Sequence, residues 1–103
     1  MQKVFDFISD PGHGWVKVPF KVITDLCISE GISSYSYMRG GFAYLEEDCD
    51  ATLFHKSFEQ CFGYPPKYRE RNAREKTSRV RNYDRYTKWA PMTHAHHQSL
   101  VNK

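Results

Sequence analysis

Basic and aromatic side chains are interleaved through residues 67–88, where nine Lys or Arg residues stand against three Asp or Glu residues. Lysine and arginine neutralise phosphates and release counterions, and tyrosine and tryptophan stack on nucleobases. The segment therefore predicts a surface that binds nucleic acid or an acidic protein; a solvated edge strand whose charges prevent edge-to-edge pairing is the alternative. The candidate partner-binding residues, which include one hairpin arginine, are Arg39, Lys67, Tyr68, Arg69, Arg71, Arg74, Arg79, Arg81, Tyr83, Arg85, Tyr86 and Trp89.

Residues 46–50, with the sequence EEDCD, form a second group that could do chemistry. Clustered carboxylates hold divalent cations, and His13 or His55 could add an imidazole ligand. Asp48 or Asp50 is equally suited to capping the start of a following helix. Because the spacing matches no established ligand pattern, we favour the structural role and expect no metal site or cofactor.

The histidines offer a third chemistry. His13, in the sequence GHGW, has a side chain that titrates near neutrality and is the best single choice for a general base. No serine or cysteine lies in a recognisable nucleophile setting beside it, so we read this stretch as a turn with an aromatic anchor. His94, His96 and His97 could chelate a transition metal, but a polar tail explains them better. The sequence therefore predicts a binding protein with no catalytic residues rather than an enzyme.

Charge is distributed unevenly along the 103 residues. Residues 1–50 carry four basic and eight acidic side chains, whereas residues 51–103 carry eleven basic and four acidic ones. Such polarity is typical of a chain that presents one face to a polyanion or an acidic protein. With no apolar run long enough for a membrane span or a secretory signal, we expect a soluble cytoplasmic protein without membrane contact. Its three cysteines are expected to be buried free thiols.

The elements that must position these groups follow from periodicity and turn residues. Strands are expected at 4–8, 14–18, 67–71 and 78–83, and a hairpin at 35–45 around Gly40 and Gly41. Helices are expected at about 19–30 and 50–62, a loop at 72–77 and a flexible tail at 91–103. This order predicts a single α+β domain over 1–90, built as a mostly antiparallel sheet with two helices packed on one face. An exposed sheet edge would also allow a homodimer in place of a monomer.

Four fragments together carry a resemblance: GHGW at 12–15, SYSY at 34–37, YLEEDCD at 44–50 and SRVRNY at 78–83. The set resembles a group of small proteins of bacteriophages and other mobile elements. The resemblance covers about residues 2–86 and assigns no catalytic residues. It implies a phage accessory protein that acts by stoichiometric binding to a host factor, such as a host defence or nucleic-acid-processing complex in the host cytoplasm.

Three functional hypotheses follow. The first is an inhibitor of a host protein or ribonucleoprotein complex that binds through the basic aromatic surface, in the manner of anti-defence or anti-CRISPR proteins. The second is a nucleic-acid-binding protein that contacts phosphates through residues 67–88. The third is a small metal-dependent enzyme built on residues 46–50 and His13.

Overall fold

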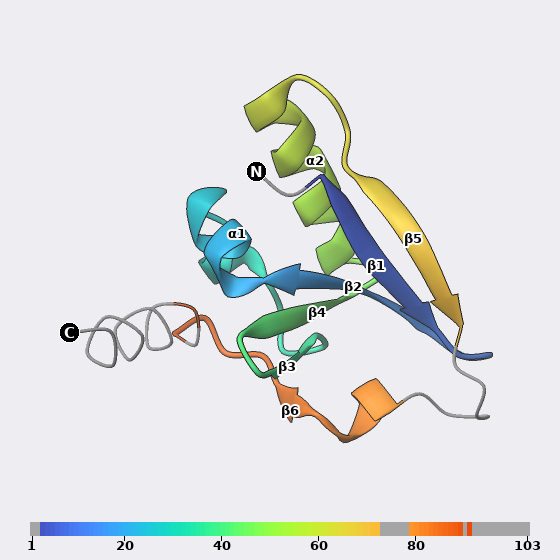
Figure 1. Cartoon of the computed structure of the whole chain (residues 1–103). Coiled ribbons are helices and arrows are strands. Elements are labelled where there is room, and N and C mark those ends of the chain that lie inside the picture. The colour runs from blue at the N-terminus through green and yellow to red at the C-terminus, as the bar shows by residue number, and fades with distance from the viewer. Residues whose placement is uncertain (1–2, 73–78, 90, 92–103) are drawn as a thin grey trace.

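The computed structural model describes residues 3–72, 79–89 and 91, and within them it contains one six-stranded sheet (Figure 1). The strand order is β5-β1-β2-β4-β3-β6, and only the pairing of β5 with β1 is parallel. The strands are β1 (Val4–Ser9), β2 (Gly14–Pro19), β3 (Tyr37–Arg39), β4 (Phe42–Glu46), β5 (Lys67–Asn72) and β6 (Asp84–Arg85). The other elements within the described residues are two helices, α1 (Phe20–Asp25) and α2 (Asp50–Phe62), and two 3-10 turns, η1 (Ser29–Gly31) and η2 (Arg79–Asn82).

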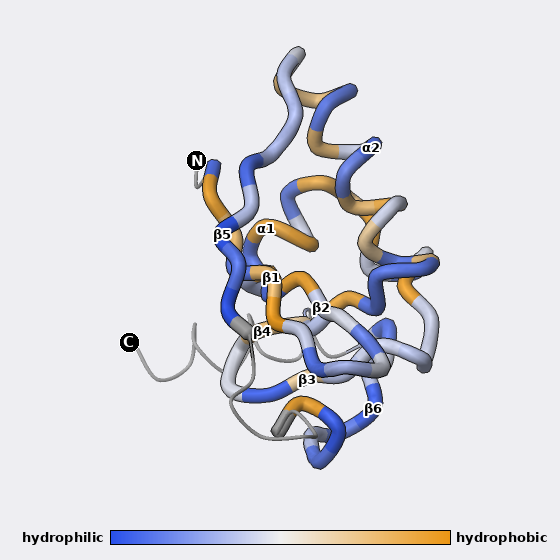
Figure 2. The backbone as a smooth tube through the Cα atoms, turned by 90° about the vertical axis from the view of Figure 1, so that its right-hand side faces the viewer, coloured by the Kyte–Doolittle hydropathy of each residue, from blue (hydrophilic) through white to orange (hydrophobic). Residues whose placement is uncertain are grey.

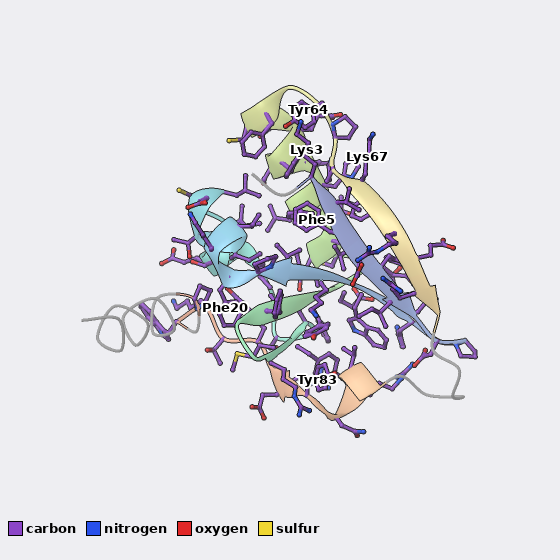
Figure 3. The ribbon with its side chains drawn as sticks, viewed as in Figure 1. Lys3, Phe5, Phe20, Tyr64, Lys67 and Tyr83 are labelled. Carbon is purple, nitrogen blue, oxygen red and sulfur yellow. The ribbon has the colours of Figure 1, made fainter. Side chains whose placement is uncertain are left out.

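The main core lies between the sheet and the two α-helices, which cover the same face. Alternate strand residues point to one side of a sheet, and those that point toward the helices are the buried Phe5, Val16, Val18, Ala43 and Leu45 and the partly buried Phe7. Figure 2 shows apolar stretches, in orange, on these strands. Phe5 of β1 packs edge-on against Phe54 of α2, with ring centroids 4.9 Å apart, and lies next to that helix in Figure 3. The predicted α+β class, with its antiparallel sheet and two helices on one face, is confirmed.

The hairpin between β3 and β4 is also confirmed. Arg39 pairs with Phe42, so only Gly40 and Gly41 form the loop. Their φ angles are +59° and +84°, which a two-residue hairpin loop requires and which glycine adopts without strain. Arg39 is therefore held at the tip of a short, well-defined turn.

The first helix is shorter than predicted. It ends at Asp25, and Cys27 has a left-handed φ of 57°. The N–H of Ile28 then donates to the carbonyl of Ile23 at 3.2 Å, which closes the helix before the chain enters η1. The prediction of one helix over 19–30 is wrong because apolar spacing continues across this reversal although the backbone does not.

The strand predicted at 78–83 is also wrong in the part of it that the structure describes. Residues Arg79–Asn82 form the 3-10 turn η2, and the only strand pairing nearby is that of β6 with β3. The turn places Val80 and Tyr83 on one side, where they pack with Trp15 and Tyr44 in a second apolar cluster. Alternating strand geometry would point Val80 and Tyr83 to opposite sides and leave one of them in water.

Two smaller predictions also fail. Neither Asp48 nor Asp50 caps α2: the cap residue is Cys49, which makes no side-chain cap hydrogen bond. The buried Asp50 carboxylate instead accepts hydrogen bonds from the hydroxyls of Ser33 and Ser36 at 2.6 and 2.5 Å. The three cysteines are exposed free thiols, not buried ones, because each lies where the backbone turns away from the core or on the outer side of α2.

The tail at 92–103, with its three histidines, lies outside the described residues, as do the loop residues 73–78. Pro91, assigned above to the tail, is fully buried. Among the described residues, no helix has the length and apolar character needed to cross a membrane.

Candidate polyanion interface and adjoining pocket

The sheet face opposite α1 and α2, called here the outer face, carries a row of polar and aromatic side chains across all six strands. Paired residues on neighbouring strands point to the same side of a sheet, so the strand pairings alone show which residues belong to this row. From β5 to β6 it consists of Arg69, Asp6, Lys17, Tyr44, Tyr37 and Arg85. Three cations and one carboxylate thus lie on one side of the sheet, and Tyr44 between them is buried in the second apolar cluster.

The β5 edge adds further positive charge to the outer face. Lys67 and Arg71 share the side of β5 that Arg69 occupies, and all three are exposed. Arg69 contacts Asp6 closely, with Nη2 at 2.8 Å and Nε at 2.9 Å from Oδ1, whereas Nε of Arg71 lies 3.8 Å from the same oxygen. Two guanidinium groups therefore share one carboxylate, and positive charge remains in excess at this edge.

Cations on the outer face also lie over aromatic rings. Lys17 Nζ is 4.3 Å from the centroid of Phe42, and the guanidinium of Arg85 is 4.6 Å from that of Tyr37. The guanidinium of Arg39 is 5.0 Å from the ring of Tyr83, which lies beside η2 in Figure 3. Such stacking holds long side chains flat on the surface while their charges stay in contact with water.

Arg81 has a different role from the other predicted contact residues. Its Nε and Nη2 donate to the two carboxylate oxygens of Asp10 at 2.8 and 3.0 Å, and the Asp10 side chain is only 1% exposed. This bidentate pair raises the pKa of Arg81 and joins η2 to the turn between β1 and β2. The positive charge of Arg81 is therefore largely neutralised by Asp10 within the protein.

The remaining predicted contact residues do not all join the outer face. Tyr86 is buried, with its hydroxyl donating to the carbonyl of Ser29, so it cannot reach a partner. Tyr68 points to the helix side and stacks on His55, with its hydroxyl 2.9 Å from Nδ1. Trp89 is 57% exposed. Arg74 and the side chain of Arg79 lie outside what the structure describes.

A pocket of about 480 Å³ opens on the outer face at the end of the row that carries Arg85. All four fragments that carry the resemblance contribute to its wall, although they are far apart in the sequence. The lining residues are His13, Trp15, Tyr35, Tyr37, Glu46, Asp48, Cys49, Arg81 and Arg85. The fold therefore gathers acidic, basic and imidazole groups around a single concave site.

Three of these residues form a compact group of metal-binding types. One ligand atom each of His13, Glu46 and Asp48 lie within 4.8 Å of one another, and Nδ1 of His13 is 3.9 Å from Oε1 of Glu46. Burial, followed by the charge of Asp48, raises the pKa of the Glu46 carboxyl. Two carboxylates of residues 46–50 are thus brought to His13, in part as the third sequence hypothesis requires, whereas Glu47 lines another cavity and Asp50 is buried.

His55 does not join this group. It lines a separate cavity of about 480 Å³ on the helix side of the sheet, together with Tyr68 and Glu70. Glu47 also lines this cavity, so His55 lies near one carboxylate of residues 46–50 but apart from Glu46 and Asp48.

Sequence reasoning missed four residues of the row on the outer face: Asp6, Lys17, Tyr37 and Tyr44. Apart from Arg39, all predicted contact residues follow residue 66, where the basic side chains are concentrated. The available signal was the alternation of β2, in which Lys17 lies between the apolar residues Val16 and Val18 and must point away from the helices.

Comparison with known proteins finds no matching protein-family model, no matching curated protein and no matching solved structure.

Proposed function

We propose that this protein acts by stoichiometric binding and that its outer face holds the phosphate backbone of a nucleic acid, either free or within a host nucleic-acid-processing complex. The observation that supports this most is the row across the sheet, in which Lys17 and Arg85 lie on the same face as the β5 cations. Five strand spacings of about 4.8 Å make the row about 24 Å long. A surface of this length contacts several phosphates at once.

The aromatic rings of the outer face favour a single strand over a duplex. Arg85 lies over the ring of Tyr37 and Arg39 over the ring of Tyr83. Planar guanidinium and aromatic groups are ones on which an unpaired base can stack. Bases within a duplex are not accessible in this way. Binding is therefore expected to depend on charge and stacking, with little preference for sequence.

Fluorescence anisotropy with labelled single-stranded DNA and RNA tests this proposal across a salt series. The logarithm of affinity should fall linearly with the logarithm of salt concentration, by about 0.7 for each phosphate neutralised on a single strand. Lys17→Gln should weaken binding and make this slope shallower. Asp6→Asn should strengthen binding, because it removes the carboxylate between Lys17 and Arg69.

Lys56→Gln is the matched control, since Lys56 is an exposed lysine of α2 on the helix side of the sheet. It should leave both the affinity and the salt slope unchanged. Absence of binding at low salt, or equal losses in Lys17→Gln and Lys56→Gln, contradicts the proposal.

An acidic surface on a host protein is the second candidate partner, and the hairpin tip favours it. Arg39 is exposed and stacked on Tyr83, and arginine and tyrosine are enriched among the residues that dominate protein interfaces. Capture from nuclease-treated and untreated host lysate separates the two candidates. A partner retained after nuclease treatment but lost with Arg39→Gln supports the protein, whereas loss on nuclease treatment supports nucleic acid.

A further inference from the structure

We propose that the pocket on the outer face binds one divalent first-row metal ion, such as Zn²⁺ or Mn²⁺, through His13, Glu46 and Asp48. These residues supply one imidazole nitrogen and two carboxylate oxygens from three different places in the fold. His13 ends the turn before β2, Glu46 ends β4, and Asp48 lies in the turn that leads into α2.

Backbone contacts hold the three ligands near one another. The N–H of Glu47 donates to the carbonyl of Gly14 at 3.1 Å, which fixes the end of β4 beside the start of β2. The N–H groups of Gly12 and His13 both donate to Oδ1 of the buried Asp10, at 3.0 and 2.9 Å. The backbone on both sides of the group is thus fixed, and only side-chain rotation separates it from a closed site.

The distances suit a small ion. Ligand atoms of a tetrahedral site with bonds of about 2.0–2.1 Å lie about 3.3 Å apart. The present separations, 3.9 Å between His13 and Glu46 and up to 4.8 Å within the group, exceed this by at most about 1.5 Å. Exposed side chains such as His13 and Asp48 cover that difference by a change of rotamer.

The kind of ion follows from the ligands. Imidazole nitrogen favours zinc and neighbouring transition metals, whereas Mg²⁺ and Ca²⁺ favour sites made wholly of oxygen. Three protein ligands leave at least one coordination position open, as in metal sites that also bind a small ligand or water.

The cationic wall of the pocket indicates what occupies that open position, and this part of the inference rests on the proposed function. Arg85 and Arg81 line the same pocket as the three ligands. Arg81 is held by Asp10, whereas Arg85, among the residues that the structure describes, makes a long hydrogen bond of 3.4 Å to the carbonyl of Ser34 and lies over Tyr37. A phosphate group bridging the metal and the Arg85 guanidinium satisfies both.

Isothermal titration calorimetry with Zn²⁺ tests the metal site. The parent protein for this experiment carries His94→Ala, His96→Ala and His97→Ala, so that its tail cannot chelate the ion. It should bind one Zn²⁺ per chain, and Glu46→Gln should weaken this at least tenfold. Glu59→Gln, which removes an exposed carboxylate of α2, is the matched control and should bind like the parent.

Nuclear magnetic resonance locates the ion and confirms that each variant is folded. Substoichiometric Mn²⁺ should broaden the backbone amide signals of His13 and residues 46–49 before all others. No saturable binding, equal affinity of Glu46→Gln and Glu59→Gln, or broadening centred elsewhere overturns the metal site.

Inorganic phosphate titrated into the zinc-loaded protein tests the second part. Phosphate should bind the loaded protein at least tenfold more tightly than the metal-free protein, and Arg85→Gln should abolish this difference. Zinc binding without phosphate binding refutes phosphate as the ligand of the open position but does not contradict the metal site. If zinc does not change the affinity for an oligonucleotide, the metal in the pocket takes no part in nucleic-acid binding, and the proposed function of the outer face is not contradicted.

Discussion

Replacement of Ser36 by alanine should destabilise the protein far more than the loss of one oxygen atom suggests. Ser36 is completely buried and its hydroxyl makes two hydrogen bonds. It donates to Oδ2 of Asp50 at 2.5 Å and accepts from the N–H of Glu46 at 3.0 Å. This one hydroxyl therefore joins the chain entering β3, the end of β4 and the start of α2.

The magnitude follows from the two contacts. A hydrogen bond to an ionised group contributes about 1.5–3 kcal/mol, and a buried N–H without its acceptor costs about 1–3 kcal/mol. Because the N–H of Glu46 is only partly buried, we take about 1 kcal/mol for it, so that Ser36→Ala should cost about 3 kcal/mol in total. For a domain of this size such a loss lowers the melting temperature by more than about 10 °C.

Urea denaturation followed by circular dichroism measures this loss. Ser34→Ala is the matched control, since Ser34 is exposed and its side chain makes no hydrogen bond among the described residues. It should change the free energy of unfolding by less than about 0.5 kcal/mol. A loss below about 1 kcal/mol in Ser36→Ala would show that water replaces the hydroxyl and that the three-way junction is not a source of stability.

Three further results are expected. Gly14→Ala should cost about 1–3 kcal/mol in urea denaturation, because its new Cβ would collide with the ring of Phe7. Gly12→Ala is the comparison, since its new Cβ would lie 2.9 Å from Nη2 at the end of the Arg81 side chain and 3.7 Å from Oδ1 of Asp10. Burial, with a smaller effect of the Asp50 charge, raises the pKa of Tyr86 from 10.0 to about 12. The contribution of Tyr86 to stability should therefore be complete below about pH 10 and decline as the pH rises toward 12. Urea midpoints measured at about pH 9 and pH 11 should differ less in Tyr86→Phe than in the unchanged protein. All three cysteines should react with a thiol reagent in the native protein, with Cys49 slowest because the charge of Asp50 raises its pKa; fewer than three reactive thiols contradicts the exposed placement.

Local patterns were sufficient for most of the fold. The apolar spacing of Phe54, Phe58 and Phe62 predicts α2, and the paired glycines predict the hairpin that the structure contains. What these patterns lack is information about long-range pairing. Nothing in the spacing of residues 67–71 shows that β5 runs parallel to β1 and pairs with it from Val4 to Ser9.

The predictions failed where a long-range contact overrides a local sequence pattern. Val80 alternates with arginines, which favours a strand, but the second cluster around Trp15 has room for both Val80 and Tyr83 only if the chain turns. Similarly, an acidic residue before a helix is a good cap in isolation. Asp50 is instead held by Ser33 and Ser36, and sequence alone does not place these serines beside it.

The charges of the predicted binding surface also depend on contacts that the sequence does not show. Arginine counts treat every guanidinium as available, but the fold divides them according to their partners. Arg81 faces a carboxylate that is 1% exposed and holds the turn before β2, whereas Arg39 and Arg85 lie over aromatic rings and form no ion pair among the described residues. Lys17, from the acidic half of the sequence, joins them through strand register. The positive face is therefore a property of the sheet, since its cations come from four strands and from both halves of the chain, and a run of basic residues marks only one edge of it.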